Sequence, residues 1–211
     1  MEGAKPVVKT LLSGCGRLSE LGLSVEVIAR ALRRADAETL SCTDLDPPIM
    51  AGLLRWGRTT RFLREELIGK GWSFDNPRNL ARTIHPSGDF AIVVATGDER
   101  TALADYQSGP KHAKGFATEQ AIHANGQLSF EFGSLVHIGR DGQAAGIGPL
   151  RMWFLLYYAG EDTFQVELSL PEAIDGGRIT RWTERILLPV IPRHPSPSAV
   201  AQPRMHQLLL R

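Results

Sequence analysis

His85-Pro86-Ser87-Gly88 is the stretch at which the hydrophobic period of the chain changes. Before it, apolar residues recur at intervals of three and four, as on one side of an α-helix; they are Leu53, Leu54, Phe62, Leu63, Leu67 and Ile68. After it, short runs rich in β-branched and aromatic residues are separated by Gly, Asp and Pro, which is typical of strands. This order predicts an α+β fold, with an N-terminal helical layer packed on a mainly antiparallel β-sheet.

The first half of the chain contains two well-marked helices. Ser24 offers an N-cap oxygen to a helix whose apolar stripe ends at Arg33-Arg34, an order of charges that suits the helix dipole. Asp46-Pro47-Pro48 opens a second helix, with Asp46 as its cap. We expect this helix to run from Pro48 to Ile68 and to stop at Gly69-Lys70-Gly71.

Other parts of this half predict irregular structure. We expect Ser13-Gly14-Cys15-Gly16 to break a helix that begins at Lys9, with a restart at Leu18. The residues from Trp72 to Pro77 are expected to form a loop, followed by a short helical turn through Arg82.

The second half is expected to form a sheet, and its short connections favour antiparallel pairing. The run from Met152 to Tyr158 is apolar at every position, so it predicts a central strand that is covered on both faces. A brief helix is expected from Thr118 to His123. The other expected strands are Phe90–Ala95, Gln127–Phe132 after the turn Asn125-Gly126, Phe164–Leu170, Ile179–Leu188 and a weaker one at Thr101–Tyr106.

The composition predicts a cytoplasmic protein that needs no cofactor. Of its 211 residues 43% are hydrophobic and 22% charged, as in soluble proteins, and no apolar run approaches the roughly 18 residues of a membrane span. The N-terminus lacks the apolar core of a signal peptide. Cys15 and Cys42 lack the paired spacing of a zinc or redox site. We expect one domain at 1–188, with a helical part (1–84) and a sheet part (85–188).

The residues 189–211 form a proline-rich C-terminal arm in this interpretation. Five prolines favour an extended, polyproline-like conformation. We expect the apolar residues at its end to dock in a groove of the same chain or of a second copy, which would make a homo-oligomer; they are Met205, Leu208, Leu209 and Leu210.

The strongest functional signal is an arginine-rich helix. Between Met50 and Arg82 there are seven basic and three acidic residues, a local net charge of +4 in a chain whose total is +1. Guanidinium groups neutralise phosphates and an indole stacks on bases, so this helix predicts binding to nucleic acid or to a nucleoprotein complex. The residues expected to bind are Arg55, Trp56, Arg58, Arg61, Arg64 and Arg78. The alternative is a solvated helix face whose arginines pair with neighbouring acids.

Two further functions remain open. Acidic and basic residues around the first strand suggest a metal-dependent phosphodiesterase; they are His85, Asp89, Asp98, Glu99, Asp105, Lys111, His112 and Lys114. The pattern lacks the acid-x-Lys strand of one large nuclease class, and the alternative is that these residues cap strand ends. The arm and the aromatic residues favour a third function, that of a protein-binding inhibitor or assembly factor, such as a phage or mobile-element anti-defence protein.

Two stretches, PRNLARTIHPSGDFAIVVATGD (77–98) and ELSLPEAIDGGRITRWTERILLP (167–189), carry a resemblance. They are similar to uncharacterised bacterial proteins, some of them carried on phages or mobile elements. The two stretches together make up about a fifth of the chain. The resemblance implies an accessory protein in the conflict between host and mobile element, and it transfers no functional residue.

Overall fold

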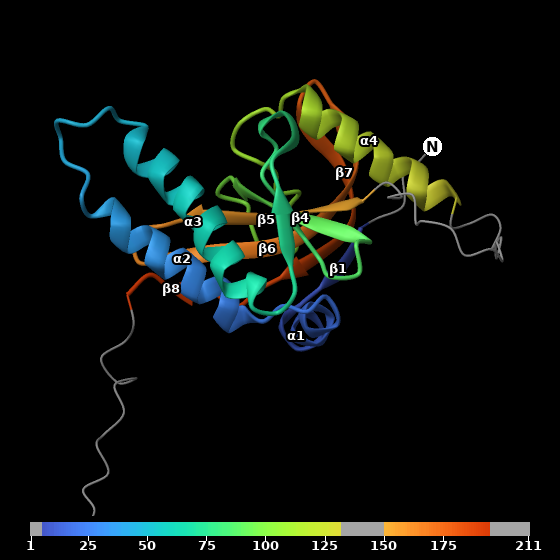
Figure 1. Cartoon of the computed structure of the whole chain (residues 1–211), viewed down its shortest axis with the longest axis horizontal. Helices are drawn as coiled ribbons and strands as arrows, with labels where there is room; N and C mark the ends of the chain where they lie inside the picture. The colour runs from blue at the N-terminus through green and yellow to red at the C-terminus, as the bar shows by residue number, and fades with distance from the viewer. Residues whose placement is uncertain (1–5, 132–149, 195–211) are drawn as a thin grey trace, which may run out of the picture.

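Figure 1 shows the computed structural model, which describes residues 6–131 and 150–194, with the backbone alone at 11–12 and 126–131. In these residues four helices pack on an eight-stranded mixed sheet. The helices are α1 (Leu11–Glu20), α2 (Val25–Thr39), α3 (Met50–Ile68) and α4 (Phe116–Glu131). The strands are β1 (Val7–Lys9), β2 (Ser73–Asp75), β3 (Arg82–Ile84), β4 (Phe90–Thr96), β5 (Arg151–Ala159), β6 (Thr163–Asp175), β7 (Arg178–Leu187) and β8 (Ile191–Pro192).

The strand order is β1-β7-β6-β5-β4-β3-β2, and β8 pairs with the start of β6. Two pairs are parallel, β1 with β7 and β4 with β5, and the other described pairs are antiparallel. The mainly antiparallel α+β fold is therefore confirmed. The parallel β4–β5 pair needs a long crossover, and the chain between these strands contains α4.

Each face of the sheet has its own apolar core. On β5, Trp153, Leu155 and Tyr157 join the core under α1, α2 and α3. The intervening Met152, Phe154 and Leu156 join the core that includes Ile122 of α4. β5 therefore lies in the middle of the sheet with both faces covered, as its unbroken apolar run predicts.

The helices expected at Ser24 and before Gly69 are both present. Ser24 caps α2, because its hydroxyl accepts a hydrogen bond from the Val27 amide. α3 ends at Ile68 with Gly69 as its C-cap, but it starts at Met50 rather than Pro48. Asp46 accepts from the Thr43 amide instead of capping α3, which has no side-chain cap.

The expected helix break at Ser13-Gly14-Cys15-Gly16 is wrong. α1 continues through both glycines, and β1 precedes it where a helix start was expected. Gly14 lies close to β7: a Cβ atom there would stand 3.3 Å from the Leu187 carbonyl oxygen. The glycine thus permits close packing of the helix on the sheet.

The sheet begins earlier than the change of period predicts. β2 occupies part of the expected loop at 72–77, and β3 lies where a helical turn was expected to end. The helical turn itself is short, Pro77–Asn79. Strands of three residues carry too little periodicity to be recognised in the sequence.

The expected strands at Gln127–Phe132 and Thr101–Tyr106 are wrong. Residues 127–131 belong to α4, and 101–106 form turns. Asn125 does not begin a turn: its buried side chain accepts from the Met152 amide and donates to the Met152 and Pro171 carbonyls. These bonds tie α4 to β5 and β6, and they override the turn preference of Asn-Gly.

The arm is described only as far as His194. β8 pairs with β6, and Arg193 donates to both carboxylate oxygens of Asp36 on α2. The residues expected to dock, Met205 and Leu208 to Leu210, lie outside the described residues. Among the described residues no helix is long and apolar enough to span a membrane.

Replacing Leu155 with Ala tests the central position of β5. Leu155 is 1% exposed, so the change removes buried methyl groups and should lower the free energy of unfolding by about 2–5 kcal/mol. Leu45→Ala is the matched control, since Leu45 is 96% exposed and should cost less than about 0.5 kcal/mol. Urea denaturation of both variants measures the difference, and equal midpoints would contradict this strand order.

Candidate cationic pocket

Three arginines of the predicted nucleic-acid surface are paired with acids. Arg55 donates to Asp36 at 2.8 Å, with its side chain only 16% exposed. Arg58 pairs with Glu38 of α2 at 2.5 Å, and Arg61 with Glu65 one turn along α3 at 2.8 Å. Two of these pairs join α3 to Asp36 and Glu38 of α2, and these two acids offset half of the local net charge of +4.

Asp36 is the centre of one such cluster. Burial disfavours its charge, but hydrogen bonds from Arg193 and Arg55 outweigh burial and hold the pKa of its carboxyl below the usual value. Asp36 thereby fixes α3 and the segment after β8 to α2. Arg55 is a structural residue in this arrangement.

The other two arginines of the surface also have partners. Arg64 donates to the carbonyl oxygens of Asp75 and Arg82 and to the side chain of Asn76. Burial lowers the pKa of its guanidinium. Arg78 donates to Gln120 of α4 at 2.7 Å. All five predicted arginines therefore make protein contacts.

The acids considered for a metal site are dispersed. No group of three His, Cys, Asp or Glu side chains suited to a metal ion occurs within residues 6–131 and 150–194. Asp98 accepts from the Arg100 amide in a turn. His85 Nδ1 accepts from the Ser87 amide while its ring stacks on Phe90 at 4.5 Å. These two residues shape the turns before and after β4.

Three basic residues of that set, Lys111, His112 and Lys114, meet Trp56 in a pocket of about 600 Å³. The pocket lies between the N-terminal half of α3, the carboxyl end of β4 and the segment 111–114. Its lining consists of Pro48, Ile49, Gly52, Leu53, Trp56, Ala95, Thr96, Lys111, His112 and Lys114. The carboxyl end of a strand at a parallel β-β pair is a common position for ligand sites in α/β sheets.

Trp56 is held in place and still accessible. Its indole nitrogen donates to the Val94 carbonyl at 2.9 Å, and the residue is 36% exposed. Ile49, the N-cap residue of α3, and Leu53, in its first turn, are 73% and 52% exposed. Together they form an apolar wall, with a positioned aromatic side chain at its inner end.

Lys111 and Lys114 supply the charge on the opposite side. The backbone fixes both: the Lys111 amide donates to the Thr96 carbonyl at 2.9 Å, and the Lys114 amide to the Gly177 carbonyl at 2.8 Å. Burial lowers the pKa of the Lys114 ammonium. The lining contains no acidic side chain, and neither ammonium bonds to another described residue.

A buried ion pair supports the loop that leads to these lysines. Glu167 and Arg185 are 0% and 1% exposed and face each other between β6 and β7. Glu167 accepts from the Ala102 amide and the Ser108 hydroxyl, and Arg185 donates to the Tyr106 carbonyl. The loop 101–108 is thus held by charged side chains of the sheet rather than by strand pairing.

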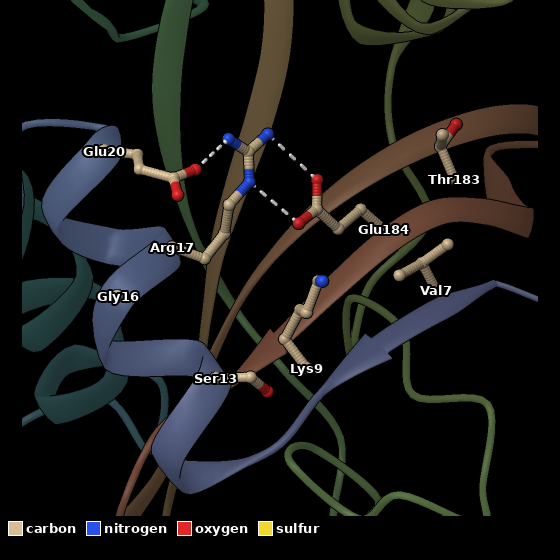
Figure 2. A pocket seen from close by; sticks show the side chains of 8 residues that line it. All are labelled: Val7, Lys9, Ser13, Gly16, Arg17, Glu20, Thr183 and Glu184. Atoms are coloured by element: carbon tan, nitrogen blue, oxygen red, sulfur yellow. Dashed lines mark hydrogen bonds and ion pairs between the residues drawn. The ribbon is translucent and has the colours of Figure 1, made fainter.

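A second pocket lies at the edge of the sheet between β1, α1 and β7 (Figure 2). Arg17 reaches across it to Glu184 of β7, and it also pairs with Glu20. These bonds raise the pKa of Arg17. The two acids neutralise the guanidinium, so this pocket presents less free charge than the pocket at Trp56.

Comparisons with protein-family models, curated proteins and solved structures give no match to this chain. Sequence reasoning had singled out Trp56, Lys111, His112 and Lys114, but it assigned them to two different functions. A basic cluster after Ser108-Gly109-Pro110 was the available signal, and only the fold joins it to Trp56.

Replacing Glu167 with Gln tests the support of the loop. The change leaves Arg185 as a buried charge without its ion-pair partner, which typically costs about 3–5 kcal/mol. Glu65→Gln breaks two exposed ion pairs, with Arg61 and Arg34, and should shift the melting temperature little. Thermal denaturation followed by circular dichroism compares the two. A Glu167→Gln protein as stable as Glu65→Gln would contradict the supporting role.

Replacing Gly177 with Ala tests how Lys114 is positioned. Gly176 and Gly177 both have positive φ, so alanine is strained at either position. A Cβ atom at Gly177 would also lie 2.8 Å from the Lys114 carbonyl oxygen, whereas one at Gly176 meets nothing within 4 Å. We therefore expect Gly177→Ala to lower the melting temperature more than Gly176→Ala. Equal melting temperatures of the two variants would show that close packing of Gly177 against the Lys114 backbone is not required.

Proposed function

We propose that this protein binds single-stranded nucleic acid, alone or in a nucleoprotein complex, in the cationic pocket. One observation carries the proposal: the ionisable side chains that line the pocket are two lysines and a histidine, beside a half-exposed tryptophan, with no acid among them. Lysine ammonium groups neutralise phosphates, and a base stacks on an indole. The pocket combines the two components that a single strand requires.

The pocket supports this function better than the arginine face of α3. A phosphate that approached Arg58 or Arg61 would compete with Glu38 or Glu65 for the guanidinium. A phosphate at Lys111 or Lys114 displaces no ion pair within the described residues. Nucleic acid therefore remains the proposed partner. Its phosphates contact the lysines of the segment 111–114 rather than the arginines of α3.

A protein partner is the second candidate, because the pocket mouth is apolar. Ile49 and Leu53, which line the pocket, are both exposed. A peptide with apolar side chains next to a carboxylate would match this wall and the lysines opposite it. Either partner suits an accessory protein of a phage or mobile element, as the sequence resemblance implies.

Charge reversal separates the pocket from the helix face. We expect Lys111→Glu with Lys114→Glu to abolish binding of a labelled single-stranded oligonucleotide of about ten nucleotides in fluorescence anisotropy. The matched control, Arg58→Glu with Arg61→Glu, also reverses two positive charges and should retain binding. Loss of binding in the control alone would place the contact on α3 and overturn the pocket proposal.

The salt dependence of the affinity then distinguishes a nucleic-acid partner from a protein partner. Two neutralised phosphate charges on a single strand predict a slope of about −1.4 in a plot of log K against log salt. Binding to an apolar protein surface is much less sensitive to salt. If the wild-type protein binds no oligonucleotide at low salt, the nucleic-acid proposal is wrong.

A further inference from the structure

We propose that the pocket recognises a terminal phosphate, a phosphomonoester next to a base, rather than the phosphodiesters within a strand. This inference rests on the proposed function and specifies the unit that the pocket accepts. Three observations carry it: the convergence of donors, the closed inner side of the pocket and the burial of Lys114.

The donors come from two separate elements. The segment 111–114 contributes two ammonium groups, and the first turn of α3 contributes the backbone amide of Gly52. This amide makes no hydrogen bond in the described structure, because it lies in the first turn of α3, which has no side-chain cap. Gly52 lines the pocket, and the space around its missing side chain is empty to 4 Å. A phosphate oxygen can therefore approach this backbone closely.

The charge of the ligand should match this set of donors. A phosphodiester carries one negative charge, whereas a phosphomonoester carries about −1.5 to −2 at neutral pH and has three strong acceptor oxygens. The two positive charges of Lys111 and Lys114, together with the Gly52 amide, exceed the single negative charge of a phosphodiester. The partly buried Lys114 ammonium has lost solvation, and a dianion replaces more of that loss than a monoanion does.

The shape of the pocket also favours a chain end. Ala95 is 2% exposed and belongs to the apolar core, so the sheet closes the inner side of the pocket at the end of β4. A volume of about 600 Å³ lies within the usual range for a small-molecule site and accommodates one nucleotide. The terminal nucleotide of a nucleic-acid strand can enter such a pocket. The remaining nucleotides then lie outside it, along the exposed wall of α3.

Oligonucleotides of one sequence test the inference. One carries a 5′-phosphate, the second a 3′-phosphate, and the third hydroxyl groups at both ends. Fluorescence anisotropy measures the affinity of each for the full chain. We expect one phosphorylated form to bind about tenfold more tightly than the hydroxyl form. Lys114→Gln should remove this preference while weak binding of the hydroxyl form persists. The Arg58→Glu, Arg61→Glu control should keep the preference.

The outcomes distinguish this inference from the proposed function. Equal binding of all three oligonucleotides would overturn the terminal-phosphate inference and leave nucleic-acid binding in place. No binding of any oligonucleotide, together with no binding of a nucleoside monophosphate, would overturn both. A nucleoside monophosphate that binds as tightly as the phosphorylated strand would support the phosphate site and show that the ligand is a free nucleotide.

Discussion

The buried ion pair of Glu167 and Arg185 is the interaction on which the candidate site depends. Desolvating both charges is expensive, and Coulomb attraction offsets that cost only when the remaining donors and acceptors are satisfied. Here Ser108, Ser169 and the Ala102 amide bond to Glu167, and the carbonyls of Leu103 and Tyr106 accept from Arg185. The pair therefore orders a stretch without regular secondary structure, and that stretch leads directly to Lys111 and Lys114.

The central elements of the fold were predictable because their sequence patterns extend over many residues. The apolar run that forms β5 and the alternating pattern at the start of β6 gave the central hairpin, and Ser24 marked the start of α2. The failures occurred where a residue preference is overridden by tertiary contacts. Gly14 occurs inside α1 because the helix packs closely against β7 at this position. Asn125 occurs inside α4 because its side chain forms hydrogen bonds with backbone groups of β5 and β6.

The candidate site was predictable only in parts. Trp56 was singled out as a base-stacking residue, and Lys111 and Lys114 as ionisable residues of a catalytic cluster. Their proximity follows from two contacts with the end of β4: the loop after β4 returns there at Lys111, whose amide donates to Thr96, and α3 places Trp56 there, where its indole donates to Val94. The sequence places more than fifty residues between Trp56 and Lys111, and no pattern in it connects them.

The distribution of arginine and lysine follows from the geometry of the two side chains. A guanidinium offers five donors in a planar fork, so one arginine satisfies several oxygens at once, as Arg64 and Arg193 do with backbone carbonyls. Such arginines join elements to one another and have little capacity left for a ligand. Lys111 and Lys114 lie on a fixed backbone, and no acid is among the described residues that line their pocket. Because Trp56 and this backbone are already held in place, a ligand that enters the pocket orders few side chains, and more of its interaction energy is retained as affinity.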